Sequence, residues 1–182
     1  MAKYSQDKAL IFDLDDTLVM TDAKIKVCDR KSGKCWTLTP EEYNSYEKKR
    51  DHVLSFDEFK SLEIMKAGKL IDRYFKLLTR HYRKGSTIGI ITARDDREMI
   101  YTWFREHLQV QIKKEFIWAI NDPVHGLKGN IAQRKKQAFQ WFIDNGYTDL
   151  SFFDDDKANI RIIDQIKKDY PALKIKTHLV KK

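Results

Sequence analysis

Three aspartates stand close together near the start of the chain, directly after a short apolar run. The run, Ala9–Phe12, is typical of a strand buried on both faces, and Asp13, Asp15 and Asp16 follow it. Side chains alternate along a strand, so we expect Asp13 and Asp15 to point to the same side. Carboxylates this close repel one another unless a cation, protons or water offset their charge. The pattern favours a site for a hard cation such as Mg²⁺, which prefers oxygen ligands, over a solvated acidic turn.

Two later strands also end in polar side chains that a buried core does not require. The strand expected at Thr87–Thr92 ends in Thr92, and the strand expected at Leu150–Phe153 is followed by Asp154 and Asp155. Ligands of open α/β sheets bind outside the carboxyl ends of the strands. If these strands are neighbours of the first one, their polar ends converge on one crevice. That crevice would be a magnesium site with room for an anion beside it.

The elements that must position these residues alternate between strand and helix. This order predicts an α/β fold with a central parallel sheet covered by helices on both faces. Two further strands are expected at Glu115–Ile120 and Leu173–Val180. Helices are expected at 40–49, 56–65, 69–83, 99–108, 130–144 and 158–168, from apolar spacing and capping residues.

A β-hairpin is predicted at Lys24–Thr39, with its turn near residues 31–33. A four-residue loop there places Cys28 opposite Cys35. We expect both to be free thiols, as in most cytosolic proteins, with a disulfide or half of a zinc site as the alternatives.

Two capping boxes predict where helices begin after the hairpin. Thr39 pairs with Glu42 in the first, and Ser55 pairs with Glu58 in the second. The segment from the hairpin to the second of these helices is therefore expected to form a flap with a small helical insertion.

Length and composition indicate one domain with a basic surface. The chain has 182 residues, a formal net charge of +8 and a pI near 9.3, which favours anionic partners. No apolar run has the length needed to span a bilayer or to serve as the core of a signal peptide. We therefore expect a cytoplasmic protein without a membrane partner, and the sequence leaves the oligomeric state open.

Three motifs in the order found here resemble those of the haloacid dehalogenase (HAD) superfamily. "DLDDTL" at 13–18 resembles the first motif, "IITAR" at 90–94 the second and "FFDDDKANI" at 152–160 the fourth. The resemblance implies a single domain over 1–182, with a flap and small helical insertion at about 20–68. It also implies a Rossmann-like three-layer sandwich in which the first strand is central, between the Thr92 strand and the Asp154 strand.

The resemblance also implies roles for the residues at these strand ends. Asp13 would be the nucleophile that forms an aspartyl-phosphate, and Asp15 would act as general acid and base. Thr92 and the backbone N–H of Ala93 would bind phosphoryl oxygens. Lys135 is the preferred phosphate-binding lysine because apolar residues follow it at three and four positions. Lys136 and, after it, Lys128 remain alternatives.

The metal ligands implied by the resemblance are Asp13, the backbone carbonyl of Asp15 and Asp155, with Asp154 as a second acidic group. The metal would be Mg²⁺. Asp16 is expected to shape the turn and Thr17 to form a local hydrogen bond. Arg94 is expected either to reach the substrate or to pair with Asp95 or Asp96, and Lys136 is also a substrate candidate.

Together these features predict a Mg²⁺-dependent phosphomonoester hydrolase with an open or lightly covered site. A narrower alternative is a nucleotidase or polynucleotide 3′-phosphatase. Trp36 on the basic flap would then stack on a base, or it packs on the core of a hydrated hairpin. Phosphotransfer to an acceptor other than water would use the same intermediate. An alternative of another class is a non-catalytic module that binds nucleic acid or phosphate.

Overall fold

A five-stranded parallel sheet forms the centre of the molecule. The computed structural model describes residues 7–181, so most of the N-terminal stretch examined for a signal segment lies outside it. The strands are β1 (Lys8–Phe12), β7 (Thr87–Thr92), β8 (Ile117–Ala119), β9 (Asp149–Asp154) and β10 (Lys174–Leu179). Their order is β10-β9-β1-β7-β8, with β1 between β7 and β9 as predicted. The α/β class and the central position of the first strand are confirmed.

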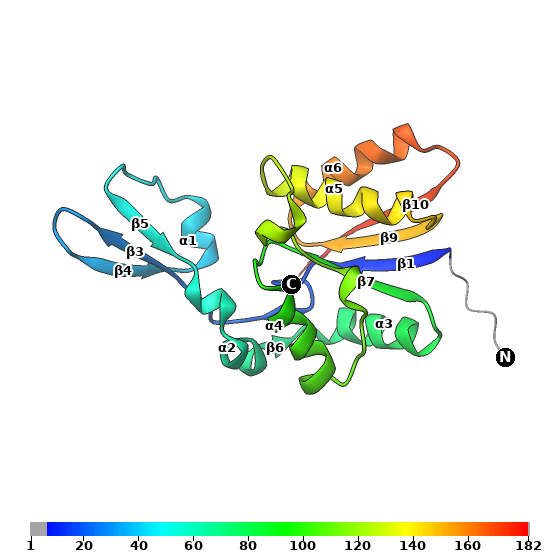
Figure 1. Ribbon diagram of the computed structural model, residues 1–182, viewed down its shortest axis with the longest axis horizontal. Coiled ribbons are helices and arrows are strands. Elements are labelled where there is room, and N and C mark those ends of the chain that lie inside the picture. Colours follow the sequence, from blue (N-terminus) through cyan, green and yellow to red (C-terminus); the bar gives the residue numbers. More distant parts are fainter. Residues whose placement is uncertain (1–6, 182) are drawn as a thin grey trace.

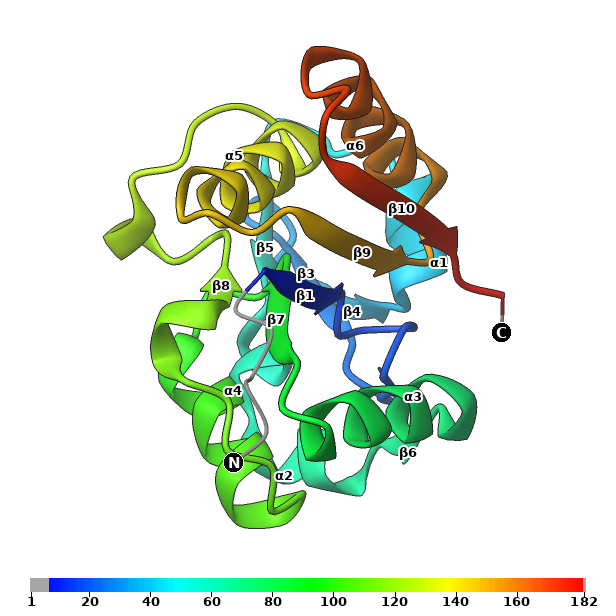
Figure 2. The ribbon, with the colours of Figure 1, turned by 90° about the vertical axis from the view of Figure 1, so that its right-hand side faces the viewer.

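Helices cover both faces of the sheet, which gives three layers (Figures 1 and 2). One face carries α3 (Asp72–Arg83) and α4 (Arg97–Thr102), and the other carries α5 (Ile131–Asp144) and α6 (Lys157–Asp169). A π-helical turn extends α4 to residue 107, close to the predicted end. The strand predicted from Glu115 is shorter than expected, because 114–116 form a 3-10 turn. Fully buried side chains on the two faces, such as Phe12 and Phe142, hold the layers together.

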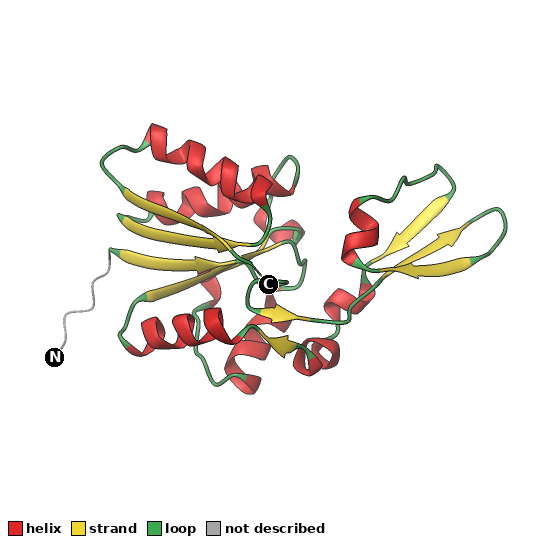
Figure 3. Cartoon of the chain, turned by 180° about the vertical axis from the view of Figure 1, so that it is seen from behind, coloured by secondary structure: helices red, strands yellow, loops and turns green. Residues whose placement is uncertain are grey.

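A small module stands apart from the sheet, beyond its carboxyl edge (Figure 3). It contains β3 (Ile25–Asp29), β4 (Cys35–Leu38), α1 (Pro40–Asn44) and β5 (His52–Ser55), and we call it the flap module. The predicted hairpin is present as β3 and β4, but β5 pairs with β3 as a third strand that was not predicted. The flap is therefore a three-stranded antiparallel sheet with one short helix.

Of the two helix starts predicted in this region, one is confirmed and the other is wrong. The Thr39–Glu42 capping box is present, although α1 ends at Asn44 and not near residue 49. The Ser55 box is wrong, because Ser61 caps α2 (Leu62–Ala67) and a 3-10 turn lies before it. The two-stranded pair of β2 (Val19–Met20) and β6 (Lys69–Leu70) then connects this segment to α3.

The two cysteines form a disulfide, so the expectation of free thiols is wrong. Cys28 and Cys35 are directly opposite each other in the β3–β4 pair, as the four-residue loop predicted, with Cα atoms 4.2 Å apart. The bond also excludes the half zinc site, because both sulfur atoms are used. Disulfides persist mainly in oxidising compartments, so this bond does not support the expected cytoplasmic location.

No helix within residues 7–181 is both long enough and apolar enough to cross a bilayer. This agrees with the absence of long apolar runs in the sequence.

Candidate active site at the carboxyl edge of the sheet

Three neighbouring strands bring their polar ends together at the carboxyl edge of the sheet. Asp13 follows β1 directly, and its backbone N–H donates to the carbonyl of Phe153 in β9 at 2.8 Å. Thr92 is the last residue of β7, and Asp154 is the last residue of β9. The side chains of Asp13, Thr92 and Asp154 are all buried. The predicted convergence of these strand ends is present.

Lys135 on α5 reaches this edge from the helical layer. Its ammonium lies 2.9 Å from Asp13 Oδ1 and 2.7 Å from Asp154 Oδ2, and its side chain is only 2% exposed. Of the three candidate lysines, Lys135 is therefore the one placed against Asp13. Lys136 is half-buried on the next helical position, and Lys128 lies exposed in the preceding loop.

Asp154 is held more tightly than the other acidic groups. Its Oδ1 accepts hydrogen bonds from the backbone N–H of Asp156 at 2.9 Å and from Asn159 Nδ2 at 3.0 Å. Its Oδ2 accepts from Lys135 at 2.7 Å. Both oxygens are thus occupied by donors, and Asp154 serves mainly to fix Lys135. Asn159 was not predicted as a site residue, although its position five residues after Asp154 places it on the first turn of α6.

Burial and neighbouring opposite charges shift the pKa values of this cluster in opposite directions. Burial acts to lower the pKa of Lys135, but the carboxylates of Asp13 and Asp154 outweigh it and raise that pKa above its usual value. Burial raises the pKa of Asp13 well above the ordinary range, with Asp154 adding to the rise and Lys135 opposing it. The Lys135 ammonium therefore stays charged, while Asp13 needs further positive charge nearby to be fully ionised.

The acidic cluster fits a divalent cation. Asp13, Asp154 and Asp155 each offer an oxygen atom, and these atoms lie within 4.8 Å of one another. Three carboxylates beside one ammonium leave two excess negative charges in a partly buried place, and an all-oxygen donor set suits a hard cation. Because Asp154 is occupied by donors, Asp13 and Asp155 are the better direct ligands. Burial, Asp154 and Asp16 together raise the pKa of Asp155 to about 6.

Two residues of the turn after β1 behave differently from each other. Asp16 has a φ of 59°, in the left-handed region, and its backbone N–H donates to the carbonyl of Val19, which agrees with a role in shaping the turn. Thr17 was expected to form a local hydrogen bond, and its backbone N–H donates to the carbonyl of Leu14 at 3.3 Å. Its Oγ1, however, is buried without a hydrogen-bond partner among the described residues, and nothing in the structure explains the isolated hydroxyl.

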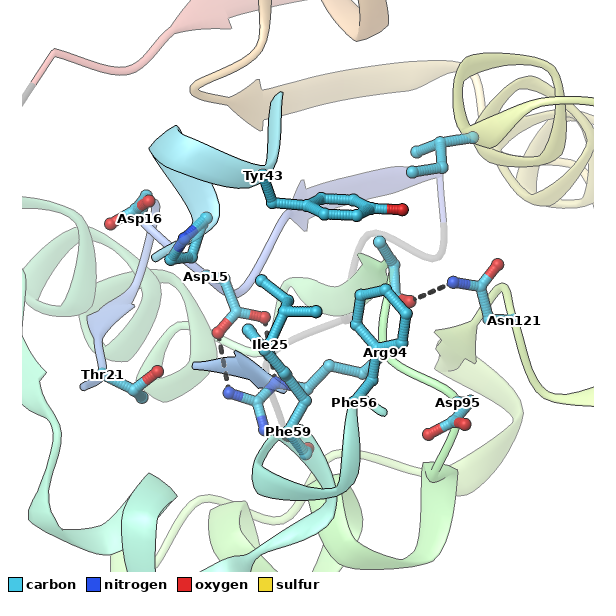
Figure 4. Close-up of a pocket in the computed structure, with 13 residues that line it drawn as sticks. Asp15, Asp16, Thr21, Ile25, Tyr43, Phe56, Phe59, Arg94, Asp95 and Asn121 are labelled. Atoms are coloured by element: carbon cyan, nitrogen blue, oxygen red, sulfur yellow. Dashed lines mark hydrogen bonds and ion pairs between the residues drawn. The ribbon is translucent and has the colours of Figure 1, made fainter. Parts of the chain in front are cut away.

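Arg94 binds Asp15 in a two-pronged ion pair (Figure 4). Its Nε and Nη2 donate to the two carboxylate oxygens of Asp15 at 2.9 and 2.7 Å, and its side chain is only 2% exposed. A third nitrogen, Nη1, donates to the carbonyl of Phe59. The predicted pairing with a neighbouring aspartate is wrong, because Asp95 pairs with Lys60 and Asp96 caps α4. Arg94 thus connects Asp15 to the segment between the flap module and α2.

Thr92 and the residue after it form the floor beside this ion pair. The backbone N–H of Arg94 donates to Thr92 Oγ1 at 3.3 Å. The carbonyl of Ala93 accepts from Asn121 Nδ2 at 2.5 Å, which fixes the peptide that follows the strand. This places Ala93 at the edge of the open space above the sheet.

That open space is a cleft of about 390 Å³ between the sheet edge and the flap module. Asp15, Arg94 and Asn121 line its sheet side and Tyr43 lies across from them (Figure 4). Phe59 lies beside Arg94, whose guanidinium carbon is 5.6 Å from the centroid of the Phe59 ring. The remaining lining residues are Asp16, Thr21, Ile25, Pro40, Phe56, Ala93, Asp95 and Ile131. A ligand in this cleft would have its charged end at Asp15 and a flat or apolar part against the flap.

The aromatic groups of the cleft differ from the one predicted. Trp36 does not line the cleft, because its ring packs edge-on against Tyr46 and His52 inside the flap module. Phe56 and Phe59 fall within the helix predicted at 56–65, whereas they lie at the 3-10 turn that faces the sheet edge. Their spacing of three residues was the signal that both rings share one side of a turn.

The residues at this edge combine a carboxylate beside a fixed ammonium, a second carboxylate held by a guanidinium, a strand-end hydroxyl and an acidic pocket. Such a set can bind an anion beside a cation and can move a proton at its rim. In the comparisons with known proteins, no family model matches the chain and no curated protein does.

Proposed function

We propose that this protein is a Mg²⁺-dependent phosphomonoester hydrolase of the HAD type, working through an aspartyl-phosphate at Asp13. The observation that carries the proposal is the buried Lys135 ammonium, 2.9 Å from Asp13 and 2.7 Å from Asp154. A fixed cation beside a nucleophilic carboxylate offsets the negative charge that an anionic phosphoryl group brings to it. Thr92, at the end of the neighbouring strand, supplies a hydroxyl for a phosphoryl oxygen.

The reaction consists of two successive displacements at phosphorus, in which each side chain has a separate role. In the first, an oxygen of Asp13 attacks phosphorus, the bond to the ester oxygen breaks, and Asp15 donates a proton to the leaving alcohol. In the second, Asp15 takes a proton from water while the water oxygen attacks phosphorus, and the bond to Asp13 breaks to release phosphate. Mg²⁺, held by Asp13 and Asp155, would supply the positive charge that keeps Asp13 ionised and offsets the phosphoryl oxygens.

The test of this proposal is a phosphoester panel with added Mg²⁺. Purified wild-type protein should hydrolyse p-nitrophenyl phosphate and at least one natural phosphomonoester, and Asp13→Asn should not. Turnover that is equal in the two proteins across the panel would remove the proposal. Salt-sensitive binding of nucleic acid without any turnover would favour the non-catalytic alternative.

The pH dependence of Mg²⁺ binding provides a second prediction. The raised pKa of Asp155, about 6, means that a proton and the cation compete for this carboxylate. We expect Mg²⁺ affinity to fall as the pH falls through this value, because a proton must be released from Asp155, and the raised pKa of Asp13 adds a further loss of affinity. Isothermal titration calorimetry from pH 5 to 8 would measure this.

The control for this titration is Asp155→Asn, which should bind Mg²⁺ more weakly and lose the part of the pH dependence that comes from Asp155. In metal-free protein, the raised pKa means that ionised Asp155 destabilises the fold above that pH, and the penalty disappears as the pH falls. Mg²⁺ should therefore raise the melting temperature more at pH 7.5 than at pH 5. An affinity that stays flat down to pH 5 would contradict the assignment of Asp155.

Arg94 is expected to position Asp15 for both proton transfers. Arg94→Met removes the two hydrogen bonds to Asp15 and should lower kcat by about 100-fold with a smaller change in KM, the size typical of a misplaced acid–base group. Arg94→Lys keeps the charge but loses the planar fork, so it should recover only part of kcat. Lys60→Met, which removes an exposed cation of the same region, should change kcat little. Equal losses in the methionine variants would contradict a specific role of Arg94.

A nucleotide or a polynucleotide 3′ end is the substrate class that we propose within this activity. The supporting observation is the aromatic lining of the cleft, to which Tyr43 and Phe59 contribute on different sides of Asp15 (Figure 4). The ester oxygen leaves toward Asp15, so the alcohol part of the substrate would lie against these rings. A base is flat and apolar on both faces and stacks on such rings.

Tyr43→Ala tests this substrate class. Loss of one stacking ring should raise KM for a 3′-nucleotide by roughly tenfold, since stacking on one aromatic residue contributes about 1–3 kcal/mol. KM for glycerol phosphate, which has no ring, should stay within about twofold. Trp36→Ala is the control, because this ring packs inside the flap module away from the cleft. A preference of the wild type for sugar phosphates would remove the nucleotide proposal and leave the phosphatase proposal intact.

A further inference from the structure

A second groove lies on the face of the sheet that carries α3, outside the cleft described above. Its volume is about 760 Å³, and it runs between α3 and the strands β1, β9 and β10. On the opposite face, α6 packs on β9 and β10, whereas α3 packs mainly on β7 and leaves this strip of the sheet open. Eight of the lining residues are lysine, arginine or histidine, and none of the described lining residues is acidic. The groove is therefore a concave and strongly basic surface.

The cations of this groove stand on two sides. Arg73 and Arg80 belong to α3, and Lys176 and Lys181 lie on or just after β10. Among the residues that the structure describes, none of these four has a carboxylate partner, in contrast to Lys76, which pairs with Asp72. Unpaired cations that face each other across a hollow raise the local positive potential, which favours an anionic ligand.

Burial and the positive potential of the groove lower the pKa of two histidines that line it. Burial lowers the pKa of His81, and the neighbouring cations Lys8, Lys84 and Arg80 lower it further. Burial also lowers the pKa of His178, together with Lys176 and Lys167. Both imidazoles are therefore held neutral, and their apolar ring faces contribute to the groove.

The floor of the groove is aromatic. The ring of Phe153 stacks on Phe12 with ring centroids 4.6 Å apart, and on its other side the ring of His178 stacks on it at 4.4 Å. Tyr74 of α3 closes the row at the edge of the helix. Phe153 and Tyr74 are buried, so the exposed ring of His178 is the aromatic face open to a ligand. A ligand in this groove would therefore meet cations at both sides and one aromatic ring on the floor, a combination that binds single-stranded nucleic acid.

We infer that this groove binds single-stranded nucleic acid, with its phosphates along the two rows of cations. Arg73 and Arg80 are seven residues apart on α3, which corresponds to about 10 Å along the helix, so the positive charge on this side is spread along the groove. A bilayer surface does not enter a hollow between a helix and a sheet. A flexible chain of regularly spaced phosphates can enter the hollow and can contact cations along its length. Its binding here does not depend on catalysis at Asp13.

The groove ends close to the catalytic edge. Phe153 in its floor precedes Asp154, and the backbone carbonyl of Asp154 accepts from the N–H of Val180 at 2.9 Å, next to the end of β10. A strand lying in the groove would therefore be held within a few residues of the candidate site. The groove would increase the local concentration of nucleic-acid ends there.

The experiment is fluorescence anisotropy with a fluorescein-labelled 15-nucleotide single strand that ends in a 3′-hydroxyl, in buffer with EDTA. The variant Arg80→Gln/Lys176→Gln removes one exposed cation from each side of the groove. Its affinity in 50 mM salt should be roughly tenfold weaker than that of the wild type. The slope of log K against log salt should be smaller by about 1.4, since each lost phosphate contact contributes about 0.7 for single strands.

The matched control is Arg161→Gln/Lys168→Gln, which removes the same two charges from α6 on the opposite face of the sheet (Figure 2). This variant and Asp13→Asn should bind the oligonucleotide as the wild type does. The inference is overturned if both double variants lose affinity equally, if the wild type does not bind at 50 mM salt, or if phosphatidylserine vesicles bind through Arg80 and Lys176 while the oligonucleotide does not. Loss of turnover in Asp13→Asn with unchanged binding would separate this groove from the proposed reaction.

Discussion

Replacing Asp13 with asparagine is expected to lower phosphatase turnover by roughly 10⁴-fold or more, the size found when a nucleophile is removed. The amide has no anionic oxygen to attack phosphorus, so the first displacement cannot begin. The fold should tolerate the change, because Asn has the shape of Asp and its amide removes a buried charge beside Asp154. We therefore expect the melting temperature of metal-free Asp13→Asn to equal or exceed that of the wild type.

The measurement is steady-state turnover of p-nitrophenyl phosphate with Mg²⁺, alongside thermal unfolding of the same samples. Asp22→Asn is the control, because it makes the same chemical change in the segment that leads into the flap module. It should retain activity within about threefold, as expected for a surface substitution. Residual activity of Asp13→Asn above about one per cent, in protein free of deamidation by mass spectrometry, would show that Asp13 is not the nucleophile. Radiolabel from ³²P substrate trapped on the wild type and absent from Asp13→Asn would identify the intermediate directly.

The cluster of polar side chains at the carboxyl edge of the sheet could be predicted from the sequence because each strand-end side chain follows a buried apolar run. Asp13, Thr92 and Asp154 stand at the ends of strands, and the geometry of parallel sheets brings such ends to one edge whatever the intervening chain does. Lys135 could be favoured over Lys136 for a similar reason. Helical spacing relates Lys135 to Ala138 and Phe139, both fully buried, so its side chain had to face the sheet.

The partners of Asp15 could not be predicted in the same way. Arg94 is 79 residues away in sequence, and two nearer aspartates offered it local pairs that looked equally good. What decides the pairing is the 3-10 turn that brings the carbonyl of Phe59 to the third guanidinium nitrogen. That turn depends on the flap module and its third strand, β5, a four-residue segment whose pairing with β3 is also long-range. The cleft could therefore not be predicted from the sequence, because its walls come from two separate parts of the fold, the sheet edge and the flap module.

The disulfide illustrates a different limit. The loop length predicted that Cys28 and Cys35 would face each other, and they do. The oxidation state of two facing thiols depends on their surroundings as well as on geometry, so the sequence could not decide between thiols and a bond. The location of the protein accordingly stays a prediction.

Lys135→Met is expected to have the largest effect on stability. It leaves Asp13 and Asp154 buried beside each other without the ammonium that lies 2.9 and 2.7 Å from them. Breaking a buried ion pair by removing one partner costs about 3–5 kcal/mol of the free energy of unfolding. In a chain of this size that corresponds to a fall in melting temperature of roughly 6–20 °C. Phosphatase activity should fall by about 10³-fold, because the phosphoryl group loses its fixed cation.

The pH dependence and two companion variants separate this explanation from a simple packing defect. Without Lys135, the pKa of Asp13, which burial already raises, rises further above its value in the unfolded chain. The added penalty exists where Asp13 would be ionised and shrinks as the pH falls, so the gap to the wild type should be smaller at pH 5 than at pH 8. Lys135→Met/Asp154→Asn removes one of the two charges and should recover part of the loss. Lys136→Met should unfold within about 2 °C of the wild type and keep its activity, since exposed or half-buried positions without such partners change stability little. A destabilisation of Lys135→Met that is the same at pH 5 and pH 8, or that Asp154→Asn does not relieve, would contradict the ion-pair network.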